Sequence, residues 1–175
     1  ILMHPKEFKK VKNNTGYLTK ESLNNAELFV GIDFSNNNRI NEIIATHKSY
    51  ILFPSKDAIN LSKNNPQADT QNDKNMAVFL IDSTWACTKK MFNESENLQK
   101  LQHMSFESSR VSHYLSTIES THVVLELLDK WNIESIENQN LEGFLNPFFK
   151  MIEYQKELIA NPKSHAVRFK KRKLK

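Results

Sequence analysis

Residues 76–91 read MAVFLIDSTWACTKKM, and the fold is best inferred from this stretch outward. Met76 to Ile81 is entirely apolar, which is typical of a buried, central strand of a parallel sheet. A helix is predicted from about Thr84 to Met91. In α/β proteins, ligands bind beyond the carboxyl ends of the strands, which is where Asp82 stands. Asp82 is therefore either a carboxylate that takes part in chemistry or the N-cap of the following helix.

Strands and helices alternate on both sides of this stretch. The apolar spacing predicts further strands at residues 1–4, 27–32, 49–53 and 101–106. It predicts helices at residues 15–23 and 37–47 and a helix start at 55–58. Another helix is expected with Ser116 as its N-cap and Glu119 in a capping box. A long helix is expected at residues 135–159, bent near Pro147. The polar residues 63–75 are predicted to form a loop. This order predicts a mainly parallel sheet covered by helices on both faces.

Size and composition are those of a single domain with a hydrophobic core. The chain has 175 residues, of which 39% are apolar, and no apolar run approaches membrane-spanning length. The single cysteine, Cys87, cannot form an intramolecular disulfide, which is typical of a cytoplasmic protein. The chain starts at Ile1 without a signal peptide, and we expect it to be part of a longer protein.

The positive charge is concentrated near the two ends. The net charge is +4, and six of the 24 basic side chains fall within residues 168–175, which contain no acid. A second basic cluster comprises Lys6, Lys9, Lys10 and Lys12. Such clusters are either solvated surfaces or sites that attract phosphates in a salt-dependent way.

Several kinds of site are not expected. None of the three glycines has the spacing of a phosphate-binding loop, which argues against a dinucleotide site. The six histidines are scattered and one cysteine cannot complete a structural zinc site, so no metal centre is predicted in this segment. Trp85 is interpreted either as a core residue or as a stacking surface for a base.

Five short sequence blocks are informative when they are considered together and in their order along the chain. They are His4-Pro5-Lys6-Glu7, Asn14-Thr15-Gly16, Phe53-Pro54-Ser55, Asp82-Ser83-Thr84-Trp85 and Leu115-Ser116-Thr117-Ile118-Glu119. The fourth block resembles the Asp-x-Thr-Trp signature of the DTW-domain family, and the others resemble that family's His-Pro-x-Glu, Asn-Thr-Gly, aromatic-Pro-Ser and Ser-Thr-Ile-Glu motifs. The chain departs from the family at Ser83, where glycine is common, and at Ser120, where alanine is common. The sequence starts just after the place where the cysteine-rich, zinc-binding segment of bacterial members would end, so metal binding by the complete protein is left open.

The resemblance implies a fold and an activity. The fold would be SPOUT-like, an α/β knot with a C-terminal trefoil knot, in one catalytic domain at residues 1–167 followed by a basic tail at 168–175. The activity would be that of a tRNA-uridine aminocarboxypropyltransferase. Such an enzyme moves the 3-amino-3-carboxypropyl group of S-adenosylmethionine onto N3 of a uridine and releases methylthioadenosine. The partner would be tRNA, with no role for DNA or a membrane.

The same resemblance suggests which residues form the site. We predict that Asp82 accepts the uridine proton or, alternatively, only organises its loop. The residues predicted to hold the cofactor are Phe53, Pro54, Ser55, Ile81, Asp82, Ser83, Thr84, Trp85, Leu115, Ser116 and Thr117. The residues predicted to contact RNA are Lys6, Lys9, Lys10, Lys12, Asn14, Thr15, Lys89, Lys90, Arg168, Lys170, Lys171 and Arg172. Two other functions remain open, a SPOUT-type RNA methyltransferase and a non-catalytic RNA-binding module.

Overall fold

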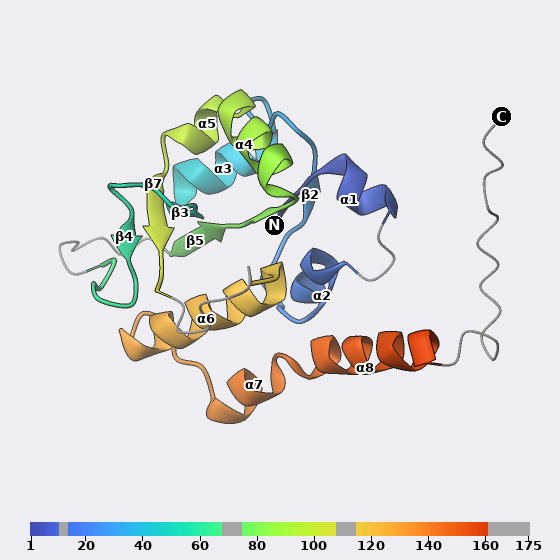
Figure 1. Cartoon of the computed structure of the whole chain (residues 1–175). Helices are drawn as coiled ribbons and strands as arrows, with labels where there is room; N and C mark the ends of the chain where they lie inside the picture. The colour runs from blue at the N-terminus through green and yellow to red at the C-terminus, as the bar shows by residue number, and fades with distance from the viewer. Residues whose placement is uncertain (11–13, 68–74, 108–114, 161–175) are drawn as a thin grey trace, which may run out of the picture.

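The computed structural model describes residues 1–10, 14–67, 75–107 and 115–160, in which strands and helices alternate (Figure 1). The strands are β1 (Leu2–Met3), β2 (Phe29–Val30), β3 (Lys48–Leu52), β4 (Ile59–Asn60), β5 (Met76–Phe79), β6 (Ile81–Asp82) and β7 (Gln102–Ser105). The helices are α1 (Pro5–Lys10), α2 (Thr15–Glu21), α3 (Asn38–Thr46), α4 (Trp85–Glu94), α5 (Glu96–Gln99), α6 (Thr117–Lys130), α7 (Asn138–Gly143) and α8 (Asn146–Ala160).

The apolar stretch before Asp82 lies at the centre of the strand arrangement. Its first half, β5, pairs with β3, and its second half, β6, pairs with β1. Only Leu80 separates the two halves, so this one segment joins the set β4-β7-β3-β5 to the set β6-β1-β2. Every strand pair that the described residues form is parallel. The predicted parallel pairing is confirmed, but residues 76–81 form two short strands, each at the edge of one of two sheets that the chain joins at Leu80, rather than one strand of a single sheet.

Helices cover both faces of the strands, as Figure 1 shows. Successive residues of a strand point to opposite faces, so neighbours on β3 enter different cores. Ile51 packs with Ile40 of α3 and Met91 of α4 in one cluster. Tyr50 packs with Val124 of α6 in a second cluster on the other face. A third cluster, which includes Ile118 and Phe148, joins α6 to α7 and α8.

Three of the blocks that resemble family motifs are helix starts with a clear physical reason. His4 Nδ1 accepts a 3.1 Å hydrogen bond from the Lys6 N–H, and Pro5 takes the first position of α1, where no N–H donor is needed. The Asn14 side chain accepts a 3.1 Å bond from the Tyr17 N–H and caps α2. The Glu119 carboxylate accepts a 2.9 Å bond from the Ser116 N–H, which confirms the predicted capping box of α6.

Two predictions of local structure are wrong. Residues 55–58 form a turn that leads into β4 rather than the start of a helix, because Ile59 and Asn60 pair with β7. Residues 135–159 do not form one bent helix but α7 and α8, which are separate helices with Pro147 in the first turn of α8. Proline is compatible with a first turn and disrupts a helix interior, so the chain begins a new helix there.

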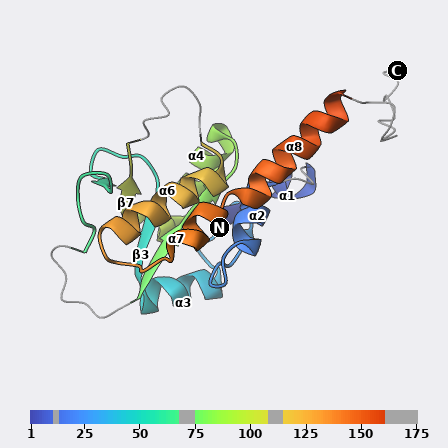
Figure 2. The ribbon, with the colours of Figure 1, turned by 90° about the horizontal axis from the view of Figure 1, so that it is seen from below.

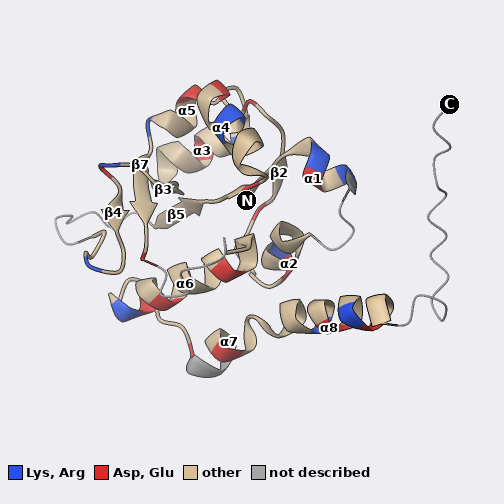
Figure 3. Ribbon diagram, viewed as in Figure 1, with Lys and Arg blue, Asp and Glu red and all other residues tan. Residues whose placement is uncertain are grey.

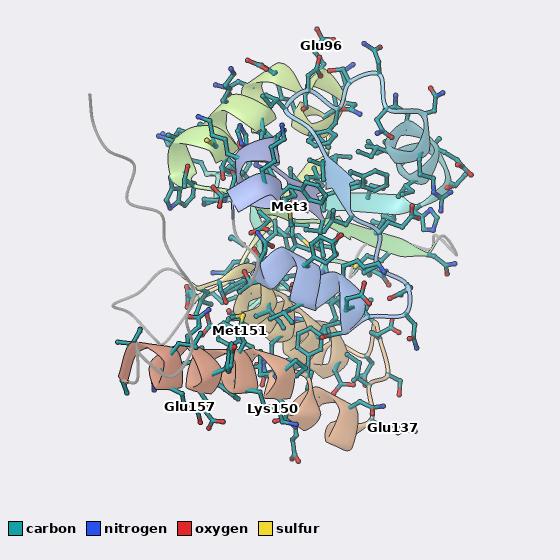
Figure 4. The ribbon with its side chains drawn as sticks, turned by 90° about the vertical axis from the view of Figure 1, so that its right-hand side faces the viewer. Met3, Glu96, Glu137, Lys150, Met151 and Glu157 are labelled. Carbon is teal, nitrogen blue, oxygen red and sulfur yellow. The ribbon has the colours of Figure 1, made fainter. Side chains whose placement is uncertain are left out.

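Helix α8 is attached to the body by one side only. Figure 2 shows that it extends away from the remaining elements. Met151 lies on the side that faces the body and packs with the third cluster, whereas Lys150 and Glu157 point outward (Figure 4). No helix within the described ranges is both long enough and apolar enough to cross a bilayer.

Candidate functional site

The carboxyl ends of three strands open onto one pocket of about 620 Å³. It is lined by residues that end or follow β3, β6 and β7, among them Phe53, Asp82 and Phe106. Because these strands run in parallel, their carboxyl ends meet at one edge, which is where α/β proteins bind ligands. The volume is within the range of about 300–1,000 Å³ that is usual for small-molecule and cofactor sites.

All the residues predicted to hold the cofactor line this pocket except Ser55. Ser55 is exposed in the turn that follows β3 and does not reach the pocket wall. The structure thus brings together segments that lie far apart in the chain: the end of β3, the Asp82 loop and the start of α6. Their part in binding is not tested by this geometry and stays a prediction.

Asp82 is held from two sides. Thr117 donates a 2.7 Å hydrogen bond from Oγ1 to Asp82 Oδ1. On the other side the backbone of Gly16 lies so close that a Cβ at position 16 would overlap Oδ2 and lie 2.9 Å from Cγ. Oδ2 is buried and accepts no hydrogen bond from any residue that the structure describes. Burying a carboxylate oxygen without a hydrogen bond costs free energy. A ligand group that donates a hydrogen bond would remove this cost. To reach Oδ2 it requires that the Asp82 side chain turns or that the Gly16 segment moves.

The interpretation of Asp82 as a helix N-cap is wrong. Asp82 ends β6, and α4 starts at Trp85 with Thr84 as its N-cap. The Thr84 side chain makes no capping hydrogen bond. Because Thr84 and Trp85 line the pocket, the positive end of the α4 helix dipole lies at the pocket and suits a ligand with negative or acceptor groups.

The aromatic side of the pocket centres on Phe53. Its ring stacks on Phe92 with 4.4 Å between centroids. It makes T-shaped contacts with Trp85 and His103, with centroid distances of 6.4 Å and 5.7 Å. Trp85 is 45% exposed, so its interpretation as a core residue is wrong. Phe53 is fixed by its neighbours, whereas Trp85 presents a large surface at the pocket on which a flat ring can stack.

The rest of the lining is neutral and rich in hydroxyl groups. Among the described residues that line the pocket, Asp82 alone has an ionisable side chain. Ser83 stands where the family often has glycine. Its hydroxyl group is hydrogen-bonded to that of Thr88, with 2.7 Å between the oxygens, and this bond holds the loop against α4. A site with one carboxylate among hydroxyls suits a polar substrate from which a single proton is removed.

Sequence reasoning missed several lining residues. Met104, Ser105 and Phe106 were predicted only as the last part of a strand. The rule that parallel strands share a carboxyl edge, applied to residues 101–106 as it was to Asp82, would have found them. Thr88 and Ser120 lie one helical turn beyond Thr84 and Ser116, and the spacing of i and i+4 predicts that they share a face with these residues.

The residues predicted to contact RNA are placed differently from one another. Lys6 and Lys9 on α1, and Lys89 and Lys90 on α4, are exposed, and Figure 3 shows basic patches on both helices. Lys90 is 3.7 Å from Glu94 in an exposed ion pair. Two further predicted positions are less accessible, because Asn14 is a buried helix cap and Thr15 lines the pocket. The other predicted positions lie outside what the structure describes: the Lys10 side chain, Lys12, Arg168, Lys170, Lys171 and Arg172.

Within the described part of the chain, no three His, Cys, Asp or Glu side chains gather where they could hold a metal ion.

Comparison with known proteins identifies a family. A family model described as the DTW domain matches residues 1–156. No curated protein and no solved structure matches the chain. The matched range includes all five blocks and every described residue that lines the pocket.

Proposed function

Because the chain belongs to the DTW-domain family, we propose that it is a tRNA-modifying transferase that moves the 3-amino-3-carboxypropyl group of S-adenosylmethionine onto N3 of a uridine. Membership of the family is consistent with a role in tRNA modification. One observation carries the finer proposal: a pocket of suitable size has a single described ionisable lining group, Asp82, at the end of β6.

The residues present fit the proposed cofactor. Trp85 and Phe53 offer aromatic surface for the adenine ring, the hydroxyl groups offer partners for the ribose, and the positive end of the α4 helix dipole suits a carboxylate. S-adenosylmethionine supplies an activated carbon next to a positively charged sulfur, from which the sulfur leaves as neutral methylthioadenosine. The role of the protein is to orient this carbon toward the uridine and to exclude water.

The proposed role of Asp82 is to accept the N3 proton, either directly or through one water molecule. When the new N3–C bond forms and the C–S bond breaks, the proton on N3 must leave, and a carboxylate at the pocket is the described group that can take it. Thr117 orients the carboxylate through its hydrogen bond. The SPOUT-like fold class and the C-terminal knot stay part of this proposal, supported by the family resemblance and by the parallel pairing of the described strands.

The decisive experiment is to incubate the protein with bulk tRNA and S-adenosylmethionine and to analyse the nucleosides by mass spectrometry. We expect an aminocarboxypropyl-uridine and an equal amount of methylthioadenosine. A methylated nucleoside would instead identify an RNA methyltransferase. Binding of tRNA without consumption of S-adenosylmethionine would identify a non-catalytic module.

Asp82→Asn tests the proposed base. We expect this variant to lose transfer while its affinity for S-adenosylmethionine stays within about threefold. Asp33→Asn is the matched control, because Asp33 is exposed and does not line the pocket. Near-normal turnover by Asp82→Asn would show that Asp82 only organises the loop.

A further inference from the structure

Two aromatic rings outside the pocket are stacked on each other and yet open to solvent. Phe8 of α1 and Tyr17 of α2 have their centroids 6.2 Å apart and an interplanar angle of 27°. Each side chain is still 47% exposed despite this contact. Large aromatic side chains left this open on a small domain indicate a surface that a partner covers.

The pair is linked to the pocket through α2. Thr15 lines the pocket, Gly16 lies against the Asp82 carboxylate, and Tyr17 is the next residue. Asn14 fixes Tyr17 by accepting a hydrogen bond from its N–H group. Tyr17 therefore lies on the same short helix as two residues that contact the candidate site, although its side chain leaves α2 on a different side from that of Thr15.

The charge beside the pair is mainly positive. Lys6 and Lys9 are exposed on α1, three residues apart and so on one side of the helix, with Glu7 as the acidic residue between them (Figure 3). Aromatic rings flanked by lysines are the combination that binds single-stranded nucleic acid, because bases stack on the rings while the lysines contact the phosphates.

We propose that Phe8 and Tyr17 form a platform on which an unpaired base next to the target uridine stacks. The proposal rests on the proposed function, since it takes the substrate to be RNA. A uridine can offer N3 to the pocket only when it is unpaired, because N3 takes part in base pairing. A neighbouring base that is no longer stacked on other bases needs a new surface, and the Phe8–Tyr17 pair supplies one that is connected to the pocket through α2.

The test measures binding of the full chain to unmodified bulk tRNA and to a fluorescent, uridine-rich 12-nucleotide RNA over a range of salt concentrations. Phe8→Leu and Tyr17→Leu keep apolar volume but remove the flat rings, and we expect each to weaken binding by about tenfold. The slope of log affinity against log salt should be unchanged, because stacking releases no counterions. Tyr17→Phe keeps the ring and should bind as the wild type does. Phe149→Leu on α8, where Phe149 is 50% exposed, is the matched control and should also bind normally.

The platform is overturned if folded Phe8→Leu and Tyr17→Leu bind both RNAs within twofold of the wild type, or if Phe149→Leu weakens binding as much as they do. Thermal denaturation of each variant establishes that it is folded, and the other leucine variant carries the test if one of the two is not. Nucleoside analysis of the wild type separates this result from the proposed function. Transfer with unchanged binding of the variants refutes only the platform, whereas weakened binding of the variants without wild-type transfer refutes only the proposed reaction.

Discussion

Thr117 and Asp82 are 35 residues apart in the chain and are joined by a 2.7 Å hydrogen bond from the threonine hydroxyl to the aspartate carboxylate. The bond connects the first residue of α6 to the last residue of β6. It brings two separate blocks of the family pattern together at the pocket. One block contains the carboxylate, and the other contains the hydroxyl that donates to it.

Thr117→Val should lower transfer by about 10- to 100-fold, because misplacing a reacting group by about 1 Å has effects of this size. Thr117→Ser keeps the donor and should restore the rate.

Thr121→Val is the control for this substitution. Thr121 is buried one turn further along α6 and donates to the Thr117 carbonyl rather than to Asp82. A purely structural role for Thr117 would be indicated if Thr117→Val and Thr121→Val lowered the rate equally.

Gly16→Ala should destabilise the protein by about 1–3 kcal/mol, since the added methyl group has no space beside the Asp82 carboxylate. The control is Gly143→Ala at the end of α7, where a Cβ would be 3.7 Å from Nδ2 of Asn146, an ordinary van der Waals contact. That substitution should change stability by no more than about 1 kcal/mol and in the stabilising direction. Urea denaturation measures both values, and equal stability of the two variants would contradict the close packing of Gly16 on Asp82.

Much of the fold could be predicted because it depends on local patterns. The apolar run before Asp82 indicated strand structure, and Ser116 with Glu119 indicated a helix start, both of which are present. The helix start predicted at residues 55–58 was wrong because Ser, Lys and Asp occur often both at helix starts and in turns. The turn forms because Ile59 and Asn60 pair with β7, a contact between distant segments that the local sequence does not reveal.

The site could be predicted only in part for a similar reason. The Asp-x-Thr-Trp block locates the loop, but the contacts of Asp82 with Thr117 and with Gly16 join three separate segments of the chain. Trp85 was open to two interpretations, since a tryptophan early in a helix suits a core as well as a ligand site. Its exposure depends on how α4 lies against Phe53, which is a property of the packed structure.

Ser95→Ala should destabilise the protein by about 1–3 kcal/mol. Ser95 is fully buried between α4 and α5, and its hydroxyl accepts a 3.0 Å hydrogen bond from the Phe34 N–H. Removing the hydroxyl leaves this buried donor without its partner. Ser35→Ala is a matched control, because the Ser35 hydroxyl accepts from the Glu96 N–H at an exposed position where water can replace it. A loss for Ser35→Ala as large as that for Ser95→Ala would contradict this account.

The basic residues of α1, of α4 and of the tail should differ in their effect on the salt dependence of tRNA binding. Each lost phosphate contact lowers the slope of log affinity against log salt by about 0.7–0.9. We expect a decrease for the double variant Lys6→Ala/Lys9→Ala and for deletion of residues 168–175. A smaller decrease is expected for Lys89→Ala/Lys90→Ala, because Glu94 already partly neutralises Lys90. Lys150→Ala, on the outer side of α8, is the control and should leave the slope unchanged (Figure 4).

If all the variants shift the slope equally, binding follows net charge alone and α1 is not a specific contact. If α1 alone shifts it, the phosphates lie beside the Phe8–Tyr17 pair and the tail does not reach the RNA.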